Sequence, residues 1–139
     1  MSQIYFAGSI SGGRHFIKTH TAMVHWLQNH GHHVLTEHII DPNVFKHEAE
    51  HTDQYIYERD IVWLQQADCL ISEVSNPSLG VGYEICFALN IGKPVLCLYH
   101  ADVFLTRMLT GNTRSGLDVK MYNSDTAWQT YMQEFLEKL

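Results

Sequence analysis

Five short apolar segments recur along the chain, and stretches with the residue spacing of a helix follow them. The apolar segments are expected to be strands over residues 4–8, 33–38, 69–74, 94–99 and 117–122. The other stretches are expected to be helices over residues 15–30, 53–67, 80–91, 102–110 and 125–138. Because strands that alternate with helices form parallel sheets, this pattern predicts an α/β fold with helices on both faces of the sheet.

The common doubly wound order for five such strands is 2-1-3-4-5, which predicts where a ligand binds. Its switch point lies between strands 1 and 3, and ligands bind outside the carboxyl ends of the strands there. The loop after strand 1 is "GSISGGR" (8–14), and the loop after strand 3 is "SNPSLGVG" (75–82). We therefore expect the two most glycine- and serine-rich loops to face each other across one crevice.

Length and charge narrow the class of protein. At 139 residues, without a visible linker or internal repeat, the chain is expected to be one domain, 1–139, in which residues 41–52 form a polar variable connection. A net charge of −6 without a basic cluster argues against binding to a nucleic acid polymer, but a single nucleotide needs only a few local donors. No apolar run approaches the length of a membrane span, so no membrane association is expected.

The cysteines and the N-terminus indicate a compartment. Cys69, Cys86 and Cys97 are an odd number, widely spaced and set in apolar segments, which is typical of reduced core thiols in a cytoplasmic protein. A nucleophilic Cys86 is the less favoured alternative, since no nearby residue obviously activates it. The N-terminus has no signal-peptide pattern.

The two loops are suited to an anion. Glycine permits close approach of the backbone, and a loop that runs into a helix presents free N–H groups. Ser9, Ser11 and Arg14 add further donors in the first loop. This loop lacks the Gly-Lys-Ser/Thr ending of a Walker A motif, and "GVG" lacks the third glycine of a dinucleotide fingerprint. Ordinary turns at helix starts are the alternative for either loop alone.

Glu84 follows the second loop, and we expect it on the first turn of a helix. The helix dipole would keep it ionised there, as a nucleophile or as a stabiliser of an oxocarbenium-like centre. Asp60 is the better candidate for a second carboxylate that supplies a proton, because Asp68 stands at the wrong end of strand 3 and is expected to be a structural cap. A plain N-terminal helix charge and a solvated helix face are the alternatives for Glu84 and Asp60.

The segment "HEAEH" (47–51) matches the H-E-x-x-H pattern of zinc proteases. That motif requires a stable helix with an apolar back and a third ligand. Here it lies in the polar connection, downstream of Pro42, without supporting periodicity. We therefore expect no metal site.

Several stretches together resemble the nucleoside 2-deoxyribosyltransferase superfamily, and most closely its 2′-deoxynucleoside 5′-phosphate N-hydrolase branch. The matching stretches are "IYFAGSISGGR" (4–14), "VLTEH" (34–38), "YERDIVWLQQAD" (57–68), "EVSNPSLGVGYE" (73–84) and "GKPVLCL" (92–98). The resemblance implies a flavodoxin-like fold, a homodimer, no metal or organic cofactor, and cleavage of the N-glycosidic bond of a deoxynucleoside monophosphate.

The resemblance also implies roles for individual residues. Glu84 matches the nucleophile that attacks C1′ to form a glycosyl-enzyme, Asp60 the aspartate that assists at the base side, and Tyr5 the tyrosine near the sugar. The substrate and its 5′-phosphate are expected to contact Gly8, Ser9, Ile10, Ser11, Gly12, Gly13, Arg14, Ser78, Gly80, Gly82 and, from the neighbouring subunit, Ser115. The family often has arginine at the position of Ser11, so this chain departs from the pattern on the phosphate side.

Three alternatives stay open at this point. A transferase that passes deoxyribose to a second free base would use the same glutamate. A hydrolase of ribonucleotides is possible, since discrimination at the 2′ position cannot be deduced from these loops. A catalytically silent nucleotide-binding module is the third, and the presence of Tyr5, Asp60 and Glu84 together argues against it.

Overall fold

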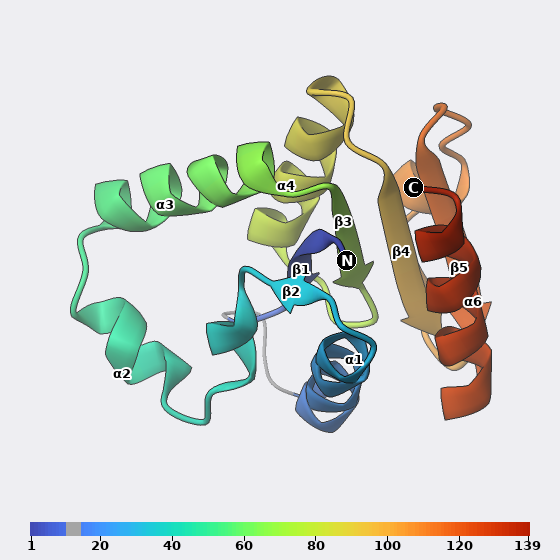
Figure 1. The fold of residues 1–139 in the computed structure, drawn as a ribbon, viewed down its shortest axis with the longest axis horizontal. Helices are drawn as coiled ribbons and strands as arrows, with labels where there is room; N and C mark the ends of the chain where they lie inside the picture. The colour runs from blue at the N-terminus through green and yellow to red at the C-terminus, as the bar shows by residue number, and fades with distance from the viewer. Residues whose placement is uncertain (11–14) are drawn as a thin grey trace.

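The sheet has the predicted order. The computed structural model describes residues 1–10 and 15–139, and these form one sheet with all strands parallel in the order β2-β1-β3-β4-β5 (Figure 1). Its strands are β1 (Gln3–Gly8), β2 (His33–Val34), β3 (Cys69–Glu73), β4 (Val95–His100) and β5 (Leu117–Tyr122). The helices are α1 (Ile17–Asn29), the 3-10 helix η1 (Glu37–Ile40), α2 (Val44–Ala49), α3 (Asp53–Gln66), α4 (Leu79–Asn90), α5 (Arg107–Thr110) and α6 (Asp125–Glu137).

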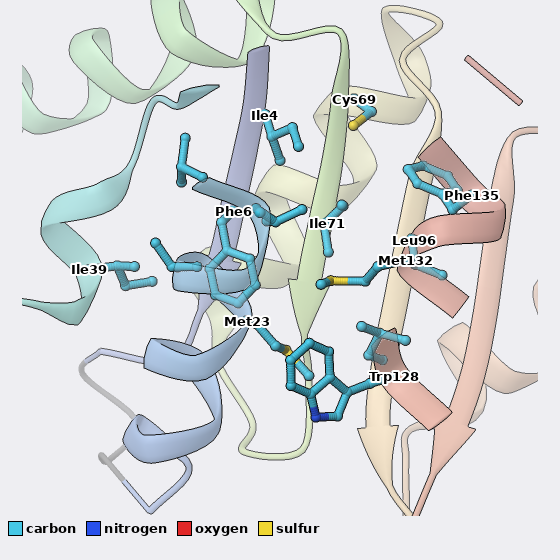
Figure 2. Close-up of a cluster of buried hydrophobic side chains, with 14 of the residues drawn as sticks. Ile4, Phe6, Met23, Ile39, Cys69, Ile71, Leu96, Trp128, Met132 and Phe135 are labelled. Atoms are coloured by element: carbon cyan, nitrogen blue, oxygen red, sulfur yellow. The ribbon is translucent and has the colours of Figure 1, made fainter. Parts of the chain in front are cut away.

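Alternate residues of β1 supply two separate cores, because successive strand residues point to opposite faces of the sheet. Ile4 and Phe6 pack with α1 and α6, in the cluster that Figure 2 shows with Met23, Trp128 and Met132. Residues of the opposite parity pack with α3 and α4, and this second core contains Tyr5, Ala7, Leu64, Val81 and Ile85. Helices therefore cover both faces of the sheet, as predicted.

The pairing of β1 with β3 brings the two glycine- and serine-rich loops to one edge. Gly8, the last residue of β1, is the Cα partner of Glu73, the last residue of β3. The buried Ser9 hydroxyl then donates a hydrogen bond of 3.5 Å to the Pro77 carbonyl, which joins the loops directly. The predicted placement of these loops side by side is confirmed for the residues that the structure describes.

The predicted strand over 33–38 is wrong beyond its first two residues. Thr36 occupies the place where the ladder would continue, and its hydroxyl accepts from the Phe6 N–H (3.0 Å) and donates to the Phe6 carbonyl (2.6 Å). A side chain thus satisfies the backbone groups that a longer β2 would pair. The chain turns into η1 instead.

Two helical predictions also need correction. The polar connection over 41–52 contains the short helix α2, which follows a turn closed by the Asn43 N–H on Asp41 (2.8 Å) and is anchored by the buried Val44. The helix expected over 102–110 begins only at Arg107, where the Thr106 hydroxyl accepts from the Met108 N–H (3.3 Å). Both helices are too short to show a clear apolar period.

The cysteines are all free, but they do not share one environment. Cys69 and Cys97 are buried, and burial raises the pKa of each thiol to about 12. Cys86 is exposed on the outer side of α4, so its predicted place in the core is wrong. Within the described residues, no helix is both long enough and apolar enough to cross a bilayer.

Candidate active site

A cavity of about 450 Å³ opens beside the end of β1. The two loops contribute Gly8, Ile10, Ser78 and Gly80 to its lining. Strand β1 and helices α3 and α4 contribute Tyr5, Asp60 and Glu84. Apart from Phe6 of β1, the remaining charged and aromatic lining comes from η1, α2 and α3: His38, Phe45, Glu48, Asp53 and Arg59. The three residues predicted to do the chemistry are therefore brought together in one hollow.

Glu84 lies on the second turn of α4, which corrects its predicted place on the first turn. The Ser78 hydroxyl caps this helix by accepting from the Val81 N–H (3.3 Å), and helical geometry starts at Leu79. The dipole acts mainly on the first turn, so it does not set the ionisation of Glu84. Burial raises the pKa of Glu84 to about 7, and the nearby Asp60 carboxylate contributes in the same direction.

Tyr5 is the hydrogen-bond donor to Glu84. Its side chain is only 3% exposed, and burial holds the pKa of its hydroxyl far above the ordinary value. It therefore stays neutral and donates to the Glu84 carboxylate, which partly offsets the rise in the pKa of Glu84. Strand β1 thus fixes a permanent donor next to the glutamate.

Asp60 has a different charge environment from Glu84. Burial raises the pKa of Asp60, but the adjacent Arg59 guanidinium opposes that rise. Arg59 Nε donates to Asp60 Oδ1 at 3.0 Å. Asp60 in turn raises the pKa of Glu84, so the charge on Asp60 affects how readily Glu84 holds a proton. Such a pair suits a reaction that needs one ionised and one protonated carboxyl.

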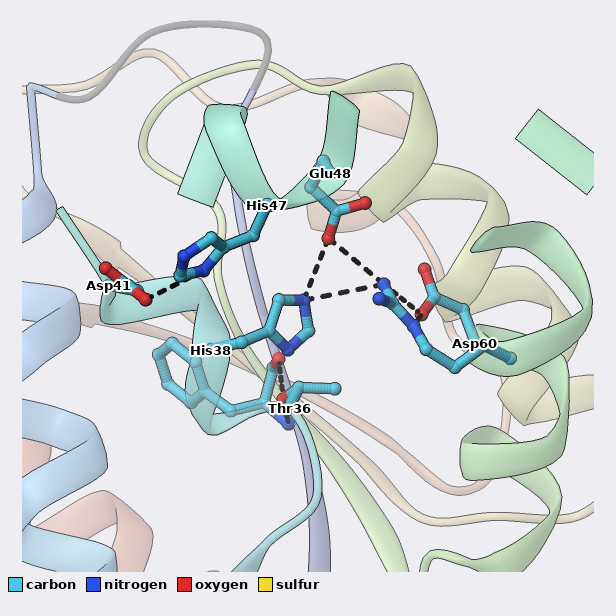
Figure 3. A network of polar contacts seen from close by, with 8 residues as sticks. Thr36, His38, Asp41, His47, Glu48 and Asp60 are labelled. Carbon is cyan, nitrogen blue, oxygen red and sulfur yellow. Dashed lines mark hydrogen bonds and ion pairs between the residues drawn. The ribbon is translucent and has the colours of Figure 1, made fainter. Parts of the chain in front are cut away.

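A polar network that the sequence did not reveal lies beside Asp60 (Figure 3). Glu48 Oε1 accepts from Arg59 Nη2 at 3.1 Å and lies 3.2 Å from His38 Nε2. The guanidinium of Arg59 also lies 4.7 Å from the centroid of the Trp63 ring. The sequence did not identify Glu48 as part of the site, because it lies on a helix too short to show a helical period.

The H-E-x-x-H segment has other roles in this fold. Helix α2 ends at Ala49, so His47 and His51 do not occupy successive turns of one helix. Instead, His47 Nδ1 pairs with Asp41 at 3.1 Å, and His51 stacks on Tyr55 with 4.4 Å between the ring centroids. Among residues 1–10 and 15–139, no group of three or more His, Cys, Asp or Glu side chains is arranged to hold a metal ion.

The other predicted loop residues are only partly gathered at the cavity. Ser9 joins the loops rather than lining the hollow, and Gly82 borders a neighbouring groove. A Cβ at Gly8 would stand 2.7 Å from the His20 ring, so packing requires glycine there. Ser115 is exposed before β5, at the opposite end of the sheet, and does not line the cavity of its own chain. The predictions for Ser11, Gly12, Gly13 and Arg14 lie outside the described residues.

A comparison with models of known protein families shows which family the chain belongs to. The model of the nucleoside 2-deoxyribosyltransferase family matches residues 4–125. The chain belongs to this family. The match includes every element that lines the cavity, so Tyr5, Asp60 and Glu84 all lie within it.

Curated relatives are similar over nearly the whole chain. A protein of Methanococcoides burtonii, provisionally named 2′-deoxynucleoside 5′-phosphate N-hydrolase 1, is 42% identical over 120 residues, which cover 86% of this chain and 98% of the relative. The 5-hydroxymethyl-dUMP N-hydrolase of Mus musculus is 40% identical over 138 residues, covering 98% of this chain and 76% of the relative. The enzyme of the same name from Danio rerio is 38% identical over 140 residues, covering 98% and 96%.

A solved structure supports the fold independently of sequence. The CMP N-glycosidase of Clostridium botulinum superimposes with a TM-score of 0.70, covering 96% of this chain and 98% of that one, at 17% identity. At that identity the likeness establishes the architecture alone. It agrees with the predicted doubly wound sheet.

Proposed function

We propose that the protein is an N-glycosidase that hydrolyses 2′-deoxynucleoside 5′-monophosphates to a free base and deoxyribose 5-phosphate. The observation that carries the proposal is that Glu84 lies beside Tyr5 and Asp60 in a cavity bordered by the two glycine- and serine-rich loops. The names of the curated relatives support the same bond and the same class of substrate.

The reaction follows from the two carboxyl groups. An ionised Glu84 attacks C1′, the C1′–N bond breaks, and its electron pair leaves with the base, which takes its proton from a protonated Asp60. Water then attacks C1′ of the glycosyl-enzyme, gives up its proton to the base-side carboxylate, and releases Glu84. Tyr5 keeps its hydroxyl on the glutamate, orienting the attacking oxygen.

The 5′-phosphate would contact the loops. Ser78 and Gly80 border the cavity at the start of α4, where free N–H groups suit an anion. The hydroxyl at Ser11 in place of a family arginine removes one positive charge from this side. We therefore infer that the phosphate is recognised mainly by backbone and hydroxyl donors, together with Arg14.

We further infer a homodimer, formed through the outer face of α4 and the segment before α5. Leu79, Phe104 and Met108 are 97%, 85% and 80% exposed, and they border a groove of about 500 Å³. Apolar side chains gathered in this way mark an interaction surface. A second copy is the occupant that would also bring Ser115 to a neighbouring site, as the family resemblance implies.

The free thiols support a cytoplasmic location.

Base release from dGMP, deoxyguanosine and GMP, followed by chromatography with wild type and Glu84→Ala, tests the proposal. Release from dGMP alone, abolished in the variant, is the expected result. Faster release from deoxyguanosine would contradict the phosphate requirement, and formation of deoxyadenosine on addition of adenine would favour the transferase. If nucleotides with this and other bases bind in calorimetry but are not hydrolysed during long incubation, the protein is a nucleotide-binding module and not an enzyme.

Light scattering after gel filtration tests the dimer. The expected mass is twice that of the 16.0 kDa chain, and Phe104→Asp together with Met108→Asp should yield the monomer. If the wild type already elutes as a monomer at the concentrations of the assay, the interface proposal is wrong and Ser115 has no part in the site.

A further inference from the structure

Arg59 is held on several sides within the wall of the cavity. Its Nε donates to Asp60 Oδ1 at 3.0 Å, and its Nη2 donates to Glu48 Oε1 at 3.1 Å. The Trp63 ring lies beneath the guanidinium, 4.7 Å from Cζ to the ring centroid. Only 16% of the Arg59 side chain is exposed. A guanidinium restrained in this way is a fixed part of the wall, because its planar fork is already committed to two carboxylates.

The partners of Arg59 come from different parts of the fold. Asp60 belongs to α3, whereas Glu48 belongs to α2, the short helix that Figure 1 shows beyond the β2 edge of the sheet. Figure 3 shows Glu48 and Asp60 directed toward the same guanidinium, with His38 of η1 next to Glu48. Helix α2 packs mainly on η1 and buries only Val44, so it depends on such polar contacts for its place over the cavity.

We propose that Arg59 is a positioning residue that orients the Asp60 carboxylate and ties it to Glu48, so that helix α2 and the base-side acid form one unit. This inference rests on the proposed function, since it deepens the part that Asp60 plays there. Glu48 and Arg59, which line the cavity near α2, would then contribute to the chemistry as well as to the shape of the site.

The same contact acts on the charge of Asp60. Arg59 acts to lower the pKa of Asp60, whereas Glu48 acts to raise it. Both effects reach Glu84 through its coupling to Asp60. Among the residues that the structure describes, the titratable and charged groups that act on the Asp60 and Glu84 carboxyls are Tyr5, His38, Glu48 and Arg59.

Two variants therefore predict shifts of opposite sign in the pH profile of kcat/KM. Arg59→Met removes the positive charge that stabilises Asp60 and Glu84 when both are ionised. The pKa for loss of the last proton therefore rises, and the alkaline limb moves to higher pH. In Glu48→Gln one neighbouring negative charge disappears while the Arg59–Asp60 contact stays, so the alkaline limb moves to lower pH. A residue that served folding alone would lower activity without moving either limb.

The size of the effect follows from misplacement of the acid. We expect Arg59→Met to lower kcat on dGMP by about 10²-fold, the cost of a catalytic group displaced by roughly 1 Å. Arg59→Lys keeps the charge but loses the fork, so it should recover the wild-type alkaline limb while recovering kcat only in part. Lys46→Met, which removes a positive charge from the exposed side of α2, is the matched control and should match the wild type.

The outcomes separate this inference from the proposed function. A wild type that releases no base from any nucleotide defeats the proposed function. An active wild type whose kcat and alkaline limb are unchanged in Arg59→Met overturns the positioning role, as does a loss of activity with both limbs in place. If Arg59→Met fails to fold, Glu48→Gln decides, because a limb that does not move to lower pH would equally overturn the proposal.

Discussion

Two glutamates stand near the same edge of the sheet, and their surroundings differ in the way that separates a structural carboxylate from a reactive one. Glu73 ends β3 and is 1% exposed, yet it accepts from the Ser75 N–H (2.8 Å), the Ser75 hydroxyl (2.7 Å) and the Tyr122 hydroxyl (2.5 Å). Burial alone would raise the pKa of Glu73, but the His20 ring, whose Nε2 lies 3.6 Å from Oε1, and these hydrogen bonds outweigh it and leave the pKa below its ordinary value.

Glu84 has a single donor, Tyr5, among the described residues, and a second carboxylate, Asp60, as its neighbour. Its pKa rises to about 7 because burial is not compensated. Glu73 is fully buried and Glu84 partly buried at the cavity wall, and burial raises the pKa of both, so burial does not explain why the two pKa shifts have opposite directions. The number of hydrogen-bond donors does distinguish them. A carboxylate with several donors is stabilised as an anion and contributes to the stability of the fold. A carboxylate with few donors is less stabilised, so it is a better nucleophile toward carbon.

The strongest test of the comparison exchanges each carboxylate for its amide, starting with Glu84→Gln. We expect base release from dGMP to fall by at least about 10³-fold, because the nucleophile is gone. The variant should also melt higher than the wild type at pH 8. Since the folded-state pKa is raised, the ionised Glu84 destabilises the fold above pH 7, and the amide carries no such charge.

Calorimetric unfolding at pH 8 and pH 5 measures the second half of this prediction. The gain in melting temperature should shrink at pH 5, where Glu84 is protonated in the folded protein. A lower melting temperature for Glu84→Gln at pH 8 would mean that the glutamate is structural after all.

Glu73→Gln should reverse the pattern. Loss of the charge and of matched acceptors for Ser75 and Tyr122 is expected to cost about 3 kcal/mol, or roughly 10 °C in melting temperature, because buried donors are left without partners. Base release by the folded protein should stay within about threefold of wild type. The folded-state pKa of Glu73 is lowered, so its contribution is present above its unfolded pKa and disappears as the pH falls through the folded value.

Acid titration of the melting temperature, from about pH 6 to pH 3, provides the check. The wild type should lose stability more steeply than Glu73→Gln over this range. Equal slopes would show that Glu73 is not held ionised by its donors.

The sequence singled out Glu84, the proposed nucleophile, and gave no hint of the role of Glu73. Glu84 follows a loop whose residues are informative at short range, as is Asp60 within "DIVWLQQAD". The environment of Glu73 depends on Tyr122, which lies 49 residues further along the chain on β5. No local pattern contains that contact, because it exists only once β3, β4 and β5 are aligned.

The same limit explains the part of the cavity wall that sequence reasoning missed. The positions of the strands follow from their apolar runs, which are pronounced in β1, β3 and β4, and the strand order follows from the common doubly wound arrangement. Residues 35–52 carry no such period, since Thr36 replaces a ladder pairing with side-chain hydrogen bonds and α2 is held by one buried valine. Arg59 and Glu48 could therefore be seen as ordinary surface charges until the fold placed them together.

Tyr5→Phe sharpens the comparison by removing the Tyr5 hydroxyl, which donates to Glu84. The hydrogen bond lowers the pKa of Glu84, so its loss raises that pKa, and the acid limb of kcat/KM moves to higher pH. Activity should fall about tenfold near pH 8, in line with the loss of one hydrogen bond to a charged group, and further at pH 6. A pH profile shows this directly. An acid limb that stays in place, or moves to lower pH, would remove Tyr5 from the role of donor.

Tyr122→Phe removes a donor from Glu73 and should have the smallest effect of the series. The Ser75 N–H and hydroxyl remain on the carboxylate, so the expected cost is about 1 kcal/mol, or 3–4 °C in melting temperature. The tyrosine acts to lower the pKa of Glu73, so acid unfolding should begin at a higher pH than in the wild type. Base release at pH 8 should match the wild type, because Tyr122 does not line the cavity. If activity is lost while the melting temperature is unchanged, Glu73 and Tyr122 take part in the reaction, and the contrast between a structural Glu73 and a reactive Glu84 is wrong.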